Sequence, residues 1–191
     1  LSRGLGDVYK RQIMISKLFI SIILSLTPIL RAELPEMVIG EESILPGINL
    51  VFEAAIKDDV FPPNQFGLEN ESDIHIEVLA NWNVNAPQGS PLNGFVAYLQ
   101  IEAEILNQAK SATKTIVLLP HVNLTDSLHY ALNTSLPGRR DDLYTVIFTV
   151  TPPDESSIGL HYDWREEVGS FLPKTYRFVY KDLDFYEIAN S

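Results

Sequence analysis

The 191-residue sequence contains no cysteine and only two methionines. The absence of cysteine excludes disulfides, iron–sulfur clusters, thiolate zinc sites and blue-copper centres, because each of these needs a cysteine sulfur. A lipid anchor carried by an N-terminal cysteine is excluded for the same reason. A domain of this chain must therefore be held together by its apolar core, and borderline metal ions can be bound only by histidine and carboxylate.

Basic residues are also scarce, with 14 Lys and Arg against 25 Asp and Glu, a net charge of −11. Residues 1–32 hold five basic residues and one acidic residue, which leaves a net charge of −15 for residues 33–191. Such a surface repels nucleic acid and anionic lipid headgroups, so we expect neither as a partner. It can concentrate cations, and it is equally typical of a soluble exported domain.

No apolar run reaches the roughly 20 residues that a membrane-spanning helix needs. The longest covers residues 18–30 and follows Met14 and Lys17, and small Ala32 stands after it at a cleavage position. This is the layout of a secretory signal peptide. An uncleaved N-terminal anchor is the alternative interpretation.

The sequence therefore predicts three segments. Residues 1–13 precede the first methionine and are interpreted as a leader or sequencing artefact. Residues 14–32 are the expected signal peptide, whose cleavage would leave the protein free of the membrane. Residues 33–191 are long enough for a single domain with its own core.

Strong helical periodicity is missing as well, whereas short alternating segments punctuated by proline and glycine recur. The expected strands cover residues 49–56, 74–80, 95–106, 114–119, 141–151 and 175–180. Residues 33–48 and 57–72 are expected to be irregular. The pattern predicts an all-β antiparallel β-sandwich, with a small closed barrel as the alternative.

Within strand 74–80, His75 and Glu77 share the face opposite Ile74, Ile76 and Val78. Alternate residues of a strand lie roughly 6–7 Å apart at Cα. An imidazole and a carboxylate at this spacing can converge on one metal ion. The same spacing also suits two ordinary polar residues on an exposed strand face.

The other three histidines lie at expected strand ends or loops. His121 follows a proline, His129 precedes a tyrosine, and His161 stands two residues after Gly159. We expect the segment between His121 and His129 to be a loop that brings both rings to one site. Four such histidines favour a metal site, although each pair could instead have a structural role.

Taken in order, these motifs resemble the periplasmic iron-transport protein family over about residues 44–184. The matching stretches are DIHIE at 73–77, the G-F-x-x-Y-L-x-I stretch at 94–101, Leu-Pro-His at 119–121, His-Tyr at 129–130 and G-x-H-x-D at 159–163. The resemblance implies an immunoglobulin-like sandwich, usually dimeric, that binds copper and iron and works beside an inner-membrane iron permease. It implies metal ligands at His75, Glu77, His129 and His161.

One position departs from the family pattern. The family has a methionine where His121 stands, the loop to His129 is one residue longer here, and Ala131 replaces a glycine. Thioether sulfur favours Cu(I), whereas imidazole suits Cu(II), Zn(II) and Fe(II). We therefore predict His121 as a further ligand, a weaker preference for cuprous ion, and zinc as a surrogate metal.

The function predicted from the sequence is a periplasmic metal-binding protein of iron uptake, and not an enzyme. A zinc-dependent hydrolase with Glu77 as its base is one alternative, although the sequence has no HExxH motif. A sandwich used for adhesion or partner binding without metal is the other. Glu36, Glu41 and Glu42 lie where a second, iron-associated site could be completed, and Trp164 is expected to pack over the metal site or in the core.

Overall fold

The computed structural model describes residues 36–191, which belong to one compact unit. The predicted leader and signal peptide lie outside the described residues. The strands are β1 (Glu36–Ile44), β2 (Ile48–Ala55), β3 (Ile74–Trp82), β4 (Gln100–Asn107), β5 (Thr113–Val122), β6 (Leu128–Thr134), β7 (Leu143–Thr151) and β8 (Tyr176–Asp184). The helical elements are α2 (Pro63–Phe66), the 3-10 turn η1 (Glu69–Glu71), α3 (Tyr162–Glu167) and α4 (Tyr186–Ala189). Within residues 36–191, no helix has the length and apolar character needed to cross a membrane.

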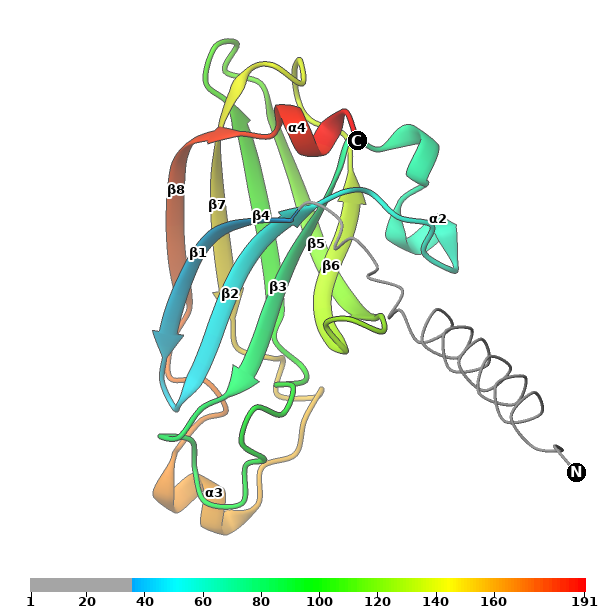
Figure 1. Ribbon diagram of the computed structural model, residues 1–191. Helices are drawn as coiled ribbons and strands as arrows, with labels where there is room; N and C mark the ends of the chain where they lie inside the picture. The colour runs from blue at the N-terminus through cyan, green and yellow to red at the C-terminus, as the bar shows by residue number, and fades with distance from the viewer. Residues whose placement is uncertain (1–35) are drawn as a thin grey trace, which may run out of the picture. The chain divides into compact units, whose positions relative to one another are not determined.

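The eight strands form one antiparallel sheet in the order β1-β2-β3-β6-β5-β4-β7-β8 (Figure 1). Strand β5 joins the two halves of the sheet. Its residues 113–118 pair with β4, and its residues 119–122 pair with β6. The two outer strands meet where Tyr180 of β8 lies against Gly40 of β1, a position at which any Cβ would overlap the tyrosine ring. The predicted all-β antiparallel fold is confirmed, in the form of a nearly closed sheet that is compatible with an immunoglobulin-like sandwich.

The core fills the space between the two halves of the sheet. Phe52 of β2 packs its ring 4.5 Å from that of Phe148 on β7 and 5.3 Å from that of Phe178 on β8. On β3, Ile74, Ile76 and Val78 are fully buried on this inner side. Alternate residues of a strand point to opposite faces, so His75 and Glu77 are directed to the outer face, as the sequence predicted.

Four details of the expected strand pattern are wrong. The strand expected over residues 95–106 begins only at Gln100, as β4. Residues 36–44 form β1 instead of an irregular entry; as an edge strand it is mostly exposed and lacks clear alternation. Strand β6 was not predicted, because residues 129–131 are all buried and hide the two-residue period. Strand β5 continues through Pro120 to Val122, because it pairs there with β6 on one side only, where a missing N–H is tolerated.

Candidate metal centre

The candidate centre lies on the outer face of three neighbouring strands. His75 and Glu77 come from β3, His129 comes from β6, and His121 of β5 is the direct cross-strand partner of His129. Glu77 pairs with Ala131, so His129, two residues before it, is the diagonal neighbour of the glutamate. Long side chains reach one another across such a diagonal. The expected loop between His121 and His129 is thus a hairpin whose two strands carry the histidines.

These side chains converge closely. His75, Glu77 and His129 each present one ligand atom, and the three atoms all lie within 4.8 Å of one another. The shortest contact joins His129 Nε2 and Glu77 Oε2 at 3.4 Å. The His121 ring centroid lies 5.3 Å from that of His75 and 5.7 Å from that of His129. All four residues are buried, which rules out the exposed strand face that the sequence left open.

Each of the three histidines uses its Nδ1 nitrogen for a hydrogen bond to an oxygen that can only accept. His121 Nδ1 donates to the Leu119 carbonyl at 3.0 Å and His129 Nδ1 donates to the Ser127 carbonyl at 3.2 Å. His75 Nδ1 donates to a side-chain amide oxygen at 2.8 Å. The proton of each neutral ring is therefore on Nδ1, which leaves the Nε2 lone pair available to a metal ion.

The acceptor for His75 is Asn133 Oδ1, on the neighbouring strand β6. The Asn133 amide also donates to the carbonyls of Asp58 and Gly67, at 2.7 and 3.2 Å. These donors fix the amide with its oxygen toward the histidine. Nothing in the local sequence signals that Asn133 contacts His75, because the two residues are 58 positions apart.

A short segment covers the centre. Residues 57–72 were expected to be a loop, and they contain α2 and η1, with α2 in contact with β6 (Figure 1). Phe66 at the end of α2 places its ring edge against His121, with centroids 4.4 Å apart. His121 Nε2 is buried there without a hydrogen-bond partner. A buried polar atom without a partner costs free energy, so this nitrogen suits a ligand.

Burial dominates the electrostatics of the cluster. It lowers the pKa of His75 to about 4, and the neighbouring histidines add to that effect. Burial also lowers the pKa of His121 and of His129. It raises the pKa of Glu77 to about 8, with Asp126 and other nearby carboxylates contributing less. At neutral pH and without a cation the imidazoles are uncharged and the Glu77 carboxyl is mostly protonated.

Further carboxylates surround Glu77. Glu53 of β2 is its direct cross-strand partner. Burial raises the pKa of Glu53, and the charges of Glu36, Asp126 and Glu41 raise it further. Asp126 lies in the β5–β6 hairpin, where its carboxylate accepts a hydrogen bond from the Asn123 amide at 2.7 Å. A cation placed here would relieve this repulsion between like charges.

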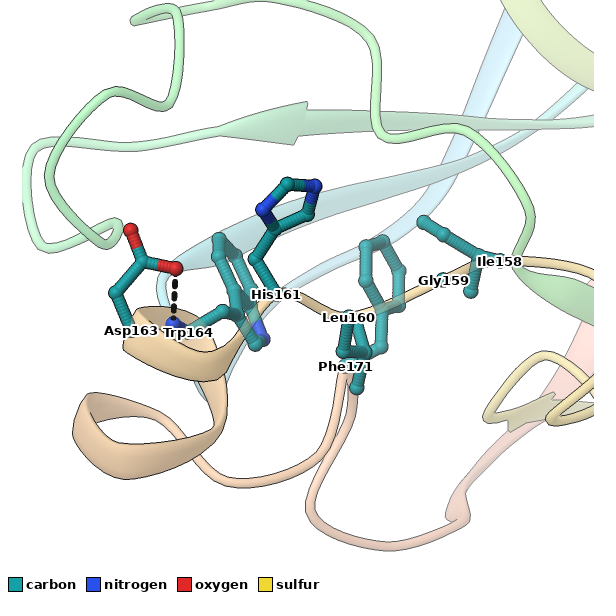
Figure 2. A pocket seen from close by; sticks show the side chains of 7 residues that line it. All are labelled: Ile158, Gly159, Leu160, His161, Asp163, Trp164 and Phe171. Atoms are coloured by element: carbon teal, nitrogen blue, oxygen red, sulfur yellow. Dashed lines mark hydrogen bonds between the residues drawn. The ribbon is translucent and has the colours of Figure 1, made fainter.

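The structure does not bring His161 into this cluster. His161 immediately precedes α3 and lines a separate pocket of about 310 Å³ with Asp163, Trp164 and Phe171 (Figure 2). The Trp164 ring lies 6.3 Å from that of Trp82, the last residue of β3. Trp82 is five residues beyond Glu77, which is about 16 Å along a strand. Trp164 therefore packs at the far end of β3 and not over the histidine cluster.

The chain is similar to a known protein family and to solved structures. A family model described as Fe2+ transport protein matches residues 33–186. A copper-bound variant of Campylobacter jejuni P19 is 26% identical, with a TM-score of 0.66 over 78% of this chain and 96% of that chain. Copper-reconstituted P19 from the same organism is 25% identical, with a TM-score of 0.65 over 77% of this chain and 94% of that chain. A copper-bound variant of FetP from uropathogenic Escherichia coli is 20% identical, with a TM-score of 0.62 over 78% and 99%, and shows likeness of fold alone. No curated protein matches the sequence.

Proposed function

This chain belongs to the Fe2+ transport protein family, and we propose that it is a periplasmic metal-binding protein of iron uptake. In this proposal it binds copper and iron and delivers iron to an inner-membrane permease, without being an enzyme. The predicted signal peptide would export it. Support comes from the family match and from the structural likeness to P19, which has been solved with copper bound.

The observation that carries the proposal is the set of buried imidazoles around Glu77. His75, His121 and His129 each have Nδ1 tied to an oxygen acceptor, so three Nε2 lone pairs are available on one patch of the sheet. Imidazole nitrogen with a carboxylate suits Cu(II), and zinc would occupy the same donors as a surrogate. A cation would also stabilise the ionised form of Glu77, which burial otherwise disfavours.

We assign iron to the carboxylate side of the same centre. Glu53 is the direct cross-strand partner of Glu77, and the charges of Asp126, Glu53 and Glu36 raise the Glu77 pKa, so these carboxylates give this side of the centre its negative charge. Carboxylate oxygen is a harder ligand than imidazole and suits Fe(II). Glu77 would then lie between a nitrogen-rich copper position and an oxygen-rich iron position. Copper bound there could take part in the redox chemistry of the iron.

The predicted homodimer is part of the proposal because it offers a place for His161. Within one chain this histidine lies in the pocket beside Trp164, which packs on Trp82 at the far end of β3, about 16 Å along the strand from Glu77. A second copy of the chain could supply it to the centre. If so, His161→Ala should weaken copper binding, and the loss should depend on protein concentration.

Titrations of the purified protein with Cu(II) and, without oxygen, with Fe(II) test the assignment. The double variant His75→Ala with His129→Ala should lose copper, because two ligands are gone. The double variant Glu36→Gln with Asp126→Asn should bind iron more weakly and keep copper. Unchanged copper binding in the histidine variant would contradict the proposal.

A matched control is Glu102→Gln with Glu155→Gln, which removes two exposed charges from other parts of the chain. This variant should bind both metals as the wild type does. If it loses iron binding as strongly as Glu36→Gln with Asp126→Asn, overall charge and not a local site attracts the iron. Delivery is tested by growth of a deletion strain in iron-limited medium, which only a metal-binding form of the chain should restore.

A further inference from the structure

We propose that Asn133 is a positioning residue of the metal centre, with two roles. It orients the His75 ring for ligation, and it fastens the covering segment of residues 58–67 to that same ligand. The inference rests on the proposed function, because it concerns how the metal is held and released.

Asn133 uses its entire hydrogen-bonding capacity. Its Oδ1 accepts from His75 Nδ1 at 2.8 Å and from the Asp58 backbone N–H at 3.3 Å. Its Nδ2 donates to the carbonyls of Asp58 and Gly67. An amide has two acceptor positions and two donor hydrogens, so a rotation of this side chain would break four bonds. Only oxygen can face His75, which keeps the proton on Nδ1 and leaves Nε2 with a lone pair for a metal ion.

His75 differs in this respect from the other two histidines. His121 and His129 donate to carbonyls of residues two positions earlier in their own chain segment. Among the described residues of the centre, His75 is the one imidazole oriented by a side chain. Its orientation can therefore be changed by a substitution that leaves every ligand in place.

The Asn133 amide also holds the covering segment. The Asp58 and Gly67 carbonyls stand on either side of α2, whose Phe66 packs against His121. Gly67 has φ +81°, and a Cβ there would lie 2.5 Å from the Asn133 carbonyl oxygen, so the segment closely approaches β6. Asn133 therefore links the orientation of the His75 ring to the position of the covering segment, which packs against His121.

Two substitutions separate the roles. Asn133→Leu has a similar shape but neither accepts nor donates a hydrogen bond. Asn133→Asp keeps an acceptor for His75 Nδ1–H and loses the donors to the Asp58 and Gly67 carbonyls. Asn107→Leu is the matched control, because Asn107 is equally buried and bonds to Asp142, outside the centre. For each variant we would measure Cu(II) affinity by chelator competition, the copper EPR spectrum, the rate of copper release to excess chelator, and thermal unfolding of the metal-free protein.

We expect Asn133→Leu to bind Cu(II) about 10- to 100-fold more weakly, with an altered EPR spectrum. Asn133→Asp should recover most of the affinity and the wild-type spectrum, but should release copper faster than wild type. Asn107→Leu should lower thermal stability and leave affinity and spectrum unchanged. If Asn133→Leu does not fold, the EPR spectrum of Asn133→Asp still tests the orienting role, and its rate of copper release still tests the role in fastening the covering segment.

The orienting role is overturned if folded Asn133→Leu keeps wild-type affinity and spectrum, or if Asn133→Asp has the altered spectrum expected of the leucine variant. The role in fastening the cover is overturned if Asn133→Asp releases copper at the wild-type rate. A wild-type protein that binds no copper would refute the proposed function itself, and this result is distinct from all of the others.

Discussion

Glu77 makes the stability of the metal-free protein depend on pH in a specific way. Its carboxyl is buried, and its pKa rises from 4.5 to about 8 on folding. The folded protein therefore holds a proton that the unfolded chain releases at lower pH. The stability that this group contributes is fully present below about pH 4.5 and is lost as the pH rises through about 8.

The size of the effect follows from the shift in pKa. At about 1.4 kcal/mol for each pKa unit, the rise on folding corresponds to about 5 kcal/mol across the whole range. Between about pH 6 and about pH 9 the expected loss is about 3 kcal/mol. His75 acts at lower pH: its pKa falls from 6.5 to about 4, so its contribution is present above about pH 6.5 and is lost as the pH falls through about 4.

The variant Glu77→Gln isolates the glutamate, because the amide has nearly the same shape and does not titrate. Urea unfolding of both metal-free proteins, with chelator present, should show about 3 kcal/mol more loss in the wild type between about pH 6 and about pH 9. Excess Cu(II) should stabilise the wild type more than the variant, because the Glu77 carboxylate is a ligand and the amide that replaces it is not. Parallel pH curves for the two metal-free proteins would refute the reasoning.

Three further predictions follow from the same geometry. Loading Cu(II) near pH 7 should release a proton mainly from Glu77, whose pKa is about 8; an indicator dye would report less release from Glu77→Gln, and equal release would contradict the assignment. His121→Met should raise Cu(I) affinity relative to Cu(II) in a competition titration, because thioether favours the cuprous ion, and an unchanged ratio would refute this argument from ligand softness. Tyr130→Phe should destabilise the protein by about 1–3 kcal/mol with unchanged copper affinity, because its hydroxyl donates to the Val96 carbonyl and accepts from the Leu99 N–H in the core; a loss of copper affinity would show that the core and the centre are coupled.

Much of the fold was accessible from local patterns in the sequence. The alternation in residues 74–80 predicted both the strand and the face that carries His75 and Glu77, because one side of β3 packs on the core. The same pattern could not show β6, where His129 is buried in the histidine cluster while Tyr130 is buried in the core. Two-sided burial removes the period of two on which such a prediction depends.

The candidate centre was predicted in its residue types but not in its full arrangement. The sequence motifs suggested His75, Glu77, His121 and His129, and the structure places them on adjoining strands. Local sequence carries no information about strand pairing, so it could not place His161 at the far end of β3. Nor could it reveal the hydrogen bond across the sheet from His75 to Asn133, which fixes the proton of that imidazole on Nδ1.

The most direct test of the central claim is the anomalous diffraction of copper in crystals of the loaded protein. The account predicts a copper peak at bonding distance, about 2.0 Å, from the Nε2 atoms of His75, His121 and His129, with the Glu77 carboxylate beside it. Copper found elsewhere on the chain would contradict the account. Crystals with no ordered copper, in which the three rings keep the positions that they have without metal, would contradict it as well.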